Sequence, residues 1–398
     1  MAKEKLGISV LQAAINRINW SFDTFEKLYV SFSGGKDSTV MLHLVAQEAR
    51  RRGRKIGMLL VDLEGQYKLT IDHGISMIDQ YADVLEVYWV CLPIHLRNAV
   101  SVYEPHWKCW EAGREDDWIR NPPSVAITDP STFDFFYDGM EFEEFVPKFG
   151  SWYADGKTCA CFVGIRADES LNRYRTVKNE NKAMFEDRKY TTWVTDGVYN
   201  IYPLYDWQTR DIWIYHGKTG DSYNGLYDLM HKAGLSIHQQ RICQPYGDDQ
   251  RKGLWLFHLI EPETWSRVVA RVNGANSGAL YAQNSGNITG TIKVTKPDGH
   301  TWESFAKMLL GSMPSKTRDH YEDKISVFLK WWKVKGYSKI PDEGQANSKE
   351  IPSWTRICKT LLRNDYWCKG LSFSQTKADS YDKYKKLMKK RRSSWNLI

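Results

Sequence analysis

The stretch Val-Ser-Phe-Ser-Gly-Gly-Lys-Asp-Ser-Thr-Val at residues 30–40 constrains the fold of this chain more than any other feature. Residues 28–32 are mostly apolar, as in a buried strand. The residues after the loop follow helical intervals, at Val40, Met41, Leu44 and Val45. A strand, a loop with two glycines and a lysine, and a helix together predict a phosphate-binding turn. The reason is that the start of a helix offers unpaired N–H groups and a positive dipole end.

Strands and helices alternate along the first half of the chain. A helix is expected over residues 6–27, and strands are expected at residues 28–32, 55–64, 84–94 and 158–169. This alternation predicts an α/β fold with a doubly wound, mostly parallel sheet, which binds its ligands at the carboxyl ends of the strands. From about residue 202 the pattern becomes helical, which predicts a helical C-terminal extension.

The same patterns suggest two domains. We expect a nucleotide-binding domain over residues 1–230 and a mainly helical domain over residues 231–398. Residues 103–157 form an insert between two expected strands, rich in Trp, Asp, Glu and Phe. An insert of this length at the ligand edge of a sheet is expected to be a lid or a wall of the substrate site.

The loop itself can hold an anion in several ways. A Walker P-loop is excluded, because Lys36 is followed by Asp37 and no glycine stands five positions before Gly35. The hydroxyls of Ser33 and Ser38 and the glycine amides can bind phosphate oxygens, and Lys36 can neutralise their charge. Asp37 can hold Mg²⁺ or a ligand hydroxyl. We expect both Lys36 and Asp37 to be exposed, so that replacing either with Ala removes nucleotide binding at little cost in stability. The alternative is an ordinary strand–helix turn.

The residues Ser33-Gly34-Gly35-Lys36-Asp37-Ser38 resemble the PP-loop of the N-type ATP pyrophosphatases and the phosphoadenosine phosphosulfate (PAPS) reductases. Residues 163–175 (VGIRADESLNRYR) and 201–215 (IYPLYDWQTRDIWIY) are similar to later segments of that superfamily. Residues 244–265 and 363–371 resemble a subgroup with a C-terminal domain of unknown function, which includes immunoglobulin-binding regulator A.

The resemblance implies an adenine nucleotide α-hydrolase-like fold that binds ATP or a PAPS-like nucleotide, with Mg²⁺. It implies chemistry at the α-phosphate, that is, adenylylation of an acceptor with release of pyrophosphate. The alternatives are a thiol-dependent PAPS reductase and a regulator that senses a nucleotide without turnover. It also implies a ParB/sulfiredoxin-like protein partner. The implied nucleotide-binding residues are Ser31, Ser33, Gly34, Gly35, Lys36, Asp37, Ser38, Asp62 and Arg166, of which Lys36, Asp37 and Arg166 are the implied catalytic residues.

Two of these residues lie outside the loop. Asp62 ends an expected strand, where it is either a ligand of a ribose or Mg²⁺ or a solvated strand end. The superfamily usually has an Asp-Thr-Gly-like sequence there, whereas this chain has Asp-Leu-Glu-Gly, so its handling of substrate is expected to differ. Arg166 also follows a strand, and its planar guanidinium suits a phosphate or sulfate. The alternative for Arg166 is a structural pair with Asp168 or Glu169.

The cysteines bear on the choice of mechanism. Cys159 and Cys161 are two positions apart on an expected strand, so both face one side of the sheet. The chain has no Cys-x-x-Cys pair to complete an iron–sulfur or zinc site with them, so we expect core thiols and no iron–sulfur cluster. The Glu-Cys-Gly-x-His-type motif of the reductases is absent, and Cys368 is only distantly similar to it. We therefore expect no single cysteine to be essential.

Composition limits the remaining choices. The chain has 398 residues, of which 42% are hydrophobic, and a net charge of +7, which tolerates an anionic ligand without requiring nucleic acid. It has seven cysteines, no signal-peptide pattern and no apolar run of about 18 residues, so we expect a cytoplasmic protein with no membrane contact. The basic tail at residues 385–392 is expected to be a solvated helix end, with a nucleic-acid contact as the alternative.

Overall fold

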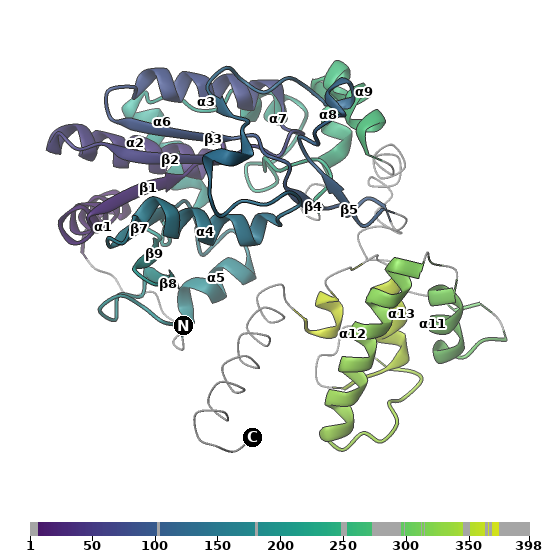
Figure 1. Cartoon of the computed structure of the whole chain (residues 1–398). Coiled ribbons are helices and arrows are strands. Elements are labelled where there is room, and N and C mark those ends of the chain that lie inside the picture. The colour runs from purple at the N-terminus through teal and green to yellow at the C-terminus, as the bar shows by residue number, and fades with distance from the viewer. Residues whose placement is uncertain are drawn as a thin grey trace. The chain divides into compact units, whose positions relative to one another are not determined.

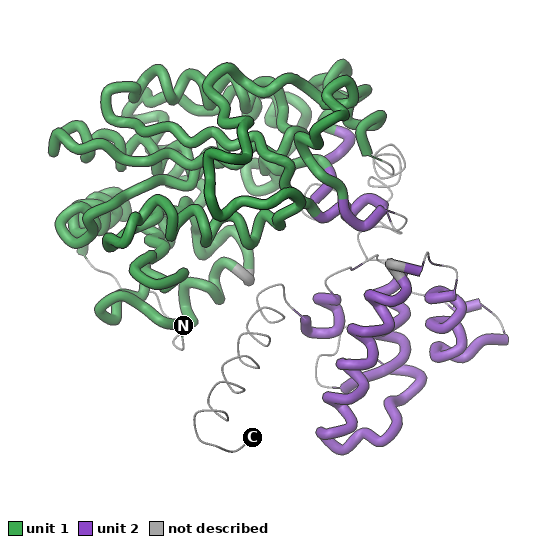
Figure 2. Tube along the Cα trace, in the orientation of Figure 1, with its two compact units in different colours: residues 1–96, 107–245, 256–272 green, residues 97–106, 246–255, 273–398 purple. Residues whose placement is uncertain are grey.

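The computed structural model describes residues 7–101, 104–179, 182–247, 253–272, 296–297, 299–311, 313, 315–344, 351–362, 365 and 368–373. The chain divides into two compact units, shown in Figure 2. Unit 1 comprises residues 1–96, 107–245 and 256–272, and unit 2 comprises residues 97–106, 246–255 and 273–398. The expected boundary between residues 230 and 231 stays a prediction. The basic tail at 385–392 lies outside the described residues.

A seven-stranded sheet forms the centre of unit 1, in the order β6-β3-β2-β1-β7-β9-β8 (Figure 1). All neighbouring strands are parallel except the edge pair β8 and β9, which is antiparallel. The sheet therefore confirms the predicted α/β fold. Its strands are β1 (Lys27–Ser31), β2 (Ile56–Val61), β3 (Leu85–Val90), β6 (Ala126–Ile127), β7 (Cys159–Val163), β8 (Thr191–Thr195) and β9 (Val198–Ile201). A second, two-stranded sheet pairs β4 (His95–Arg97) with β5 (His106–Lys108).

Helices cover both faces of this sheet. Successive side chains of a strand point to opposite faces, so each buried strand packs against helices on both sides. Tyr29 of β1 packs edge-on against Phe149 of α4, with ring centroids 5.4 Å apart. Phe162 of β7, which is paired with the next residue of β1, stacks instead on Phe22 of α1. The helices of unit 1 are α1 (Val10–Thr24), α2 (Lys36–Arg52), α3 (Lys68–Gln80), α4 (Phe142–Ala154), α5 (Leu171–Lys178), α6 (Thr209–Thr219), α7 (Leu226–Lys232), α8 (Leu254–Ile260, which begins in unit 2) and α9 (Pro262–Arg271).

The insert at residues 103–157 is largely part of the core. Its strand β6 extends the sheet beside β3, and its helix α4 covers the face that carries Tyr29. These elements belong to the core and not to a lid, and the expectation that the insert forms a wall of the substrate site stays a prediction. Aromatic residues of the insert, such as Phe145 and Phe149, are fully buried, because they fill the space between α4 and the sheet.

Residues 256–272 complete unit 1 from a distant part of the sequence. Phe257 of α8 stacks on Tyr67, with ring centroids 3.7 Å apart. The Glu261 carboxylate accepts hydrogen bonds from the amides of Lys68 (3.0 Å) and Leu69 (3.3 Å), the first two residues of α3. A carboxylate is favourable at the positive end of a helix, so Glu261 caps α3 in place of a local side chain.

The C-terminal part of unit 2 is mainly helical in the described residues between 299 and 373, as the sequence pattern predicts. Its main helices are α11 (Trp302–Gly311), α12 (Ser315–Val334) and α13 (Trp354–Leu362). Trp302, Phe305, Tyr321, Phe328 and Ile357 belong to its buried core. Among the described helices of the whole chain, none is long and apolar enough to cross a bilayer.

Candidate functional site

The loop between β1 and α2 lies where the strand order reverses. From β1 the chain adds β2, β3 and β6 on one side, and it then returns to add β7 on the other side of β1. In doubly wound sheets, ligands bind outside the carboxyl ends of the strands at such a reversal. The loop after β1 and the residues after β7 are therefore the first candidates for a ligand site.

The loop is closed by hydrogen bonds among its own residues. Gly34 has a φ of +70°, and a Cβ there would lie 2.6 Å from Cγ2 of Thr70, so only glycine fits. The hydroxyls of Ser33 and Ser38 are 3.0 Å apart. The Ser38 hydroxyl also donates to the carbonyl of Gly35 (3.0 Å). Both serines thus stabilise the turn that presents the start of α2.

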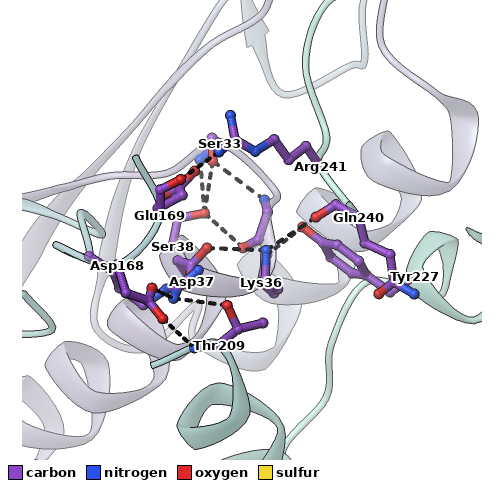
Figure 3. Close-up of polar contacts among 12 residues, drawn as sticks. Ser33, Lys36, Asp37, Ser38, Asp168, Glu169, Thr209, Tyr227, Gln240 and Arg241 are labelled. Atoms are coloured by element: carbon purple, nitrogen blue, oxygen red, sulfur yellow. Dashed lines mark hydrogen bonds and ion pairs between the residues drawn. The ribbon is translucent and has the colours of Figure 1, made fainter. Parts of the chain in front are cut away.

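Lys36 is the first residue of α2, and only 5% of its surface is exposed. Its amide donates to Oη of Tyr227 (2.9 Å), and its Nζ donates to the carbonyl of Gln240 (3.3 Å), as Figure 3 shows. The expectation that Lys36 and Asp37 are exposed is therefore wrong. The groups that cover Lys36 come from positions 191 and 204 residues further along the chain, beyond the reach of a local pattern.

Asp37 and Arg166 join the start of α2 to the end of β7. Nε of Arg166 donates to the Asp37 carboxylate, and Nη1 donates to Asp168 (2.5 Å) and to Thr209 (3.2 Å). Burial lowers the pKa of the Arg166 guanidinium, but the charge and hydrogen bond of Asp37, together with the charges of Asp168 and Glu169, leave the pKa raised. Arg166 is only 1% exposed, and a Cβ on Gly164 would lie 3.0 Å from the backbone of Asp37. This geometry favours the structural alternative for Arg166.

Further charged groups surround this pair. Glu169 pairs with Arg173, and its main-chain carbonyl accepts a hydrogen bond from Nη2 of Arg241 (2.8 Å). Burial raises the pKa of the Glu169 carboxyl. Figure 3 shows this contact between Arg241 and Glu169, so a second arginine is attached to the segment that follows β7. The sequence offers no local signal for Arg241, Tyr227 or Gln240, because only the tertiary fold brings them here.

Asp62, at the end of β2, is fully buried. Its carboxylate accepts hydrogen bonds from Nε1 of Trp89 (2.8 Å) and from Nη2 of Arg120 (2.5 and 2.6 Å to its two oxygens). Both interpretations from the sequence, a ribose or Mg²⁺ ligand and a solvated strand end, are at odds with this buried pair. Arg120 belongs to the insert, so the insert supplies the countercharge of Asp62 at this edge of the sheet.

Glu64 makes a second buried pair at the same edge of the sheet. It accepts hydrogen bonds from the amides of Trp110 (2.8 Å) and Ile119 (3.1 Å), and from Nε of Arg271 at 2.8 Å. Glu64 is fully buried and Arg271 is 6% exposed. Nη2 of Arg271 is a fourth donor, at 3.4 Å. The four donors leave little of this carboxylate for a ligand, so Glu64 fixes α9 and the insert to β2.

The described residues do not fit a magnesium site that the protein alone would hold. The carboxylate oxygens of Asp37 face two cations, Nε of Arg166 and Nζ of Lys36, the latter at 3.5 Å. Within the described ranges, no three His, Cys, Asp or Glu side chains are grouped to hold a metal ion. Ser31 ends β1 and is paired in register with Leu59 and Val163, so it stands in the strand ladder just before the loop.

Most of the cysteines are core residues. Burial raises the pKa of the Cys161 and Cys368 thiols to about 12, and it also raises that of Cys159. Cys159 and Cys161 lie on β7 with their side chains on one face, as the alternation predicts. Cys368 belongs to the core of unit 2. The buried cysteines are Cys91, Cys109, Cys159, Cys161, Cys358 and Cys368, whereas Cys243 is partly exposed.

Comparison with known proteins finds two matching family models and several relatives with similar sequences. Residues 27–233 match the family model of the phosphoadenosine phosphosulfate reductase domain, and residues 234–343 and 337–382 match a domain of unknown function, DUF3440. The chain is 45% identical over 401 residues to the uncharacterized protein YbdN of Escherichia coli (strain K12), covering 100% of this chain and 98% of YbdN. It is 25% identical over 234 residues to the phosphoadenosine 5'-phosphosulfate reductase of Xylella fastidiosa (strain 9a5c), covering 58% of this chain and 81% of the reductase.

Among solved structures, the PAPS reductase of Candida auris in its phosphate complex aligns with 59% of this chain and 89% of its own length. The identity is 15% and the TM-score is 0.30. The family assignment therefore stands on the sequence matches, which cover half of the chain for the reductase domain and all of it for YbdN. On these matches, the chain belongs to the family of proteins with a phosphoadenosine phosphosulfate reductase domain.

Proposed function

We propose that this protein binds an adenine nucleotide through the loop of residues 33–38 and acts at the α-phosphate of that nucleotide. The observation that carries the proposal is the position of the loop. It follows β1 at the reversal of the strand order, where it presents the start of a 17-residue helix and the Lys36 ammonium together. An adenine nucleotide is the class of ligand that the reductase domain suggests.

In the proposed reaction, an acceptor attacks the α-phosphorus of ATP. A new bond forms between acceptor and phosphorus, the bond to the bridging oxygen breaks, and pyrophosphate leaves with that electron pair. Negative charge accumulates on the leaving oxygens, and the Lys36 ammonium and the amides at the start of α2 stabilise it. Asp37 and Arg166 act as positioning residues, because they hold the start of α2 against the end of β7.

The alternative of a thiol-dependent PAPS reductase needs a reactive thiolate. Cys368 would have to supply it, but that thiol is fully buried, and burial raises its pKa to about 12. A thiol with such a pKa is almost entirely protonated near neutral pH, and it is then a poor nucleophile. The buried position of Cys368 thus disfavours this alternative.

The contacts of Lys36 support a third function, that of a nucleotide-sensing regulator. Both donor groups of Lys36 are already bonded to oxygens of the chain itself, so nucleotide binding would change the local structure. A change of this kind can be read by another protein. We propose a ParB/sulfiredoxin-like protein as that partner, in line with the resemblance of the sequence.

The deciding experiment incubates the purified full-length protein with α-labelled ATP or with PAPS, with and without the proposed partner. Formation of AMP and pyrophosphate supports action at the α-phosphate, whereas release of sulfite supports the reductase. Binding without turnover, measured by calorimetry, supports the regulator.

Lys36→Ala tests the role of the loop. Loss of the charged donor is expected to weaken ATP binding about 10- to 100-fold, because hydrogen bonds to charged groups contribute about 1.5–3 kcal/mol. Lys68→Ala is the matched control, since the Lys68 side chain is 76% exposed and pairs only with Asp72 on the surface of α3. Undiminished ATP affinity in folded Lys36→Ala would remove the basis of the proposed function.

A further inference from the structure

The polypeptide around α7 covers the loop of residues 33–38 with its own polar groups. Nδ2 of Asn224 donates to the carbonyl of Gly34 (3.0 Å). Oη of Tyr227 accepts from the Lys36 amide (2.9 Å), and the Gln240 carbonyl accepts from Lys36 Nζ (3.3 Å). Asn224, Tyr227 and Gln240 are at most 2% exposed. We call these three residues the cap.

The two acceptors of the cap occupy the donors that an anion would use. The Lys36 amide is the first N–H group of α2, at the positive end of the helix, and Nζ is the cation beside it. In the cap each donor meets a neutral oxygen, one phenolic and one from a carbonyl, while Nζ also faces the Asp37 carboxylate at 3.5 Å. Hydrogen bonds to a charged acceptor are roughly twice as strong as neutral ones, so phosphate oxygens can replace both.

Helix α7, which carries the Tyr227 hydroxyl of the cap, is short and lies between two glycines. Helix α7 has only seven residues and carries Tyr227. Gly225 precedes the helix, and Gly234, with a φ of +89°, follows it. Glycine adopts many backbone conformations at low cost, so both ends of α7 can act as hinges.

We propose that Tyr227 is an internal competitor for the phosphate site, and that a nucleotide must displace its hydroxyl and the Gln240 carbonyl to bind. This inference rests on the proposed function of the loop. If the hydroxyl of Tyr227 competes in this way, Tyr227 sets the affinity of the loop for phosphate-bearing ligands. A diphosphate carries more negative charge than a single sulfate or phosphate, so it is expected to replace the two acceptors more readily.

The test is Tyr227→Phe, which removes the competing oxygen and keeps the ring in place against Trp213 (centroids 5.5 Å apart). Inorganic pyrophosphate and ATP are titrated into the full-length protein by calorimetry. We expect both to bind about three- to tenfold more tightly to Tyr227→Phe, because a hydrogen bond of ordinary net strength no longer opposes them. Inorganic phosphate is expected to bind more weakly than pyrophosphate to both forms.

The matched control is Tyr223→Phe. The Tyr223 hydroxyl lies in the same part of the chain but donates to Asp228 (3.0 Å), away from the loop. Its removal is expected to leave the affinity for pyrophosphate unchanged. In the absence of ligand, Tyr227→Phe is also expected to unfold at a lower temperature than Tyr223→Phe, because the buried Lys36 amide loses its acceptor. Bound pyrophosphate gives the amide a new acceptor, so it should remove this difference in unfolding temperature.

Unchanged or weaker pyrophosphate binding in folded Tyr227→Phe would overturn the inference, and weaker binding would make the hydroxyl a ligand contact instead. In either case the proposed function stands if the wild type binds ATP and Lys36→Ala does not. If wild type, Tyr227→Phe and Tyr223→Phe all fail to bind ATP and pyrophosphate, both the proposed function and the inference are refuted.

Discussion

The pair between Asp37 and Arg166 makes a sharp prediction about stability. Asp37→Asn keeps the shape of the side chain but removes the charge that faces the Arg166 guanidinium. Arg166 is 1% exposed and cannot move into water without disturbing the end of β7. Removing one partner of a buried pair costs about 3–5 kcal/mol, because the other charge stays buried. Asp168 and Thr209 remain as partners of Arg166, so we expect a smaller loss, about 2 kcal/mol.

The assay is thermal and urea-induced unfolding of the full-length protein. For a domain the size of unit 1, a loss of about 2 kcal/mol corresponds to a fall in Tm of about 4–8 °C. Asp83→Asn is the control, because the pair of Asp83 with Arg50 has the same chemistry but both side chains are about half exposed, at 51% and 49%. The control is expected to lose less than about 1 kcal/mol. Equal stability of the two variants would refute the conclusion that the start of α2 is held by a buried pair.

Three further predictions concern single residues. Arg166→Lys is expected to lower the free energy of unfolding by about 2 kcal/mol, because lysine cannot bridge Asp37 and Asp168 at once. Urea unfolding measures this loss. If stability is unchanged and the variant binds ATP more weakly but adenosine equally well, Arg166 is a ligand contact instead. Cys368→Ser is expected to keep nucleotide binding and activity, since the thiol is buried in unit 2; an assay beside Lys36→Ala checks this, and an inactive but folded, nucleotide-bound variant would make the thiol catalytic. Burial, helped by the nearby His43 and His216, lowers the pKa of His73 from 6.5 to about 4, so the unfolded chain binds a proton in this range before the folded chain does. Neutral His73 therefore contributes up to about 3 kcal/mol to the free energy of unfolding, in full above pH 6.5, and this contribution is lost as the pH falls toward 4. In urea titrations, His73→Gln should show a smaller loss of stability between pH 7 and pH 5 than the wild type.

The sequence predicts the part of the site that local patterns encode. The strand, loop and helix at residues 28–52 follow from an apolar run, two glycines and a helical repeat, and the structure has all three in place. The burial of Lys36 does not follow from any such pattern, because Tyr227 and Gln240 reach it only through the tertiary fold. The strands β8 and β9 also lack a clear signal. They are short, and Trp193 at the edge of the sheet is 44% exposed, so no apolar run marks them.

The carboxyl-terminal edge of β2 shows the same limit. The position of Asp62 and Glu64 at the end of a strand is predictable, and for Asp62 it suggested a ligand or a solvated group. Their partners Arg120 and Arg271 lie 58 and 207 residues away. A carboxylate at a strand end looks the same in sequence whether it faces a ligand or a buried arginine. Only the partner decides, and the partner is set by packing.

The pair between Glu64 and Arg271 has a consequence for how this gene can evolve. Residue 64 lies in the match to the reductase domain and residue 271 in the match to DUF3440, yet both belong to unit 1. Suppose that recombination at residue 233 joined the reductase-domain match to a domain other than DUF3440. Glu64 would then be buried without a countercharge, and α3 would lack the Glu261 cap. The cost, several kcal/mol, is a large share of the stability of an ordinary domain. Selection should therefore keep residues 27–272 together, across the boundary between the two family matches.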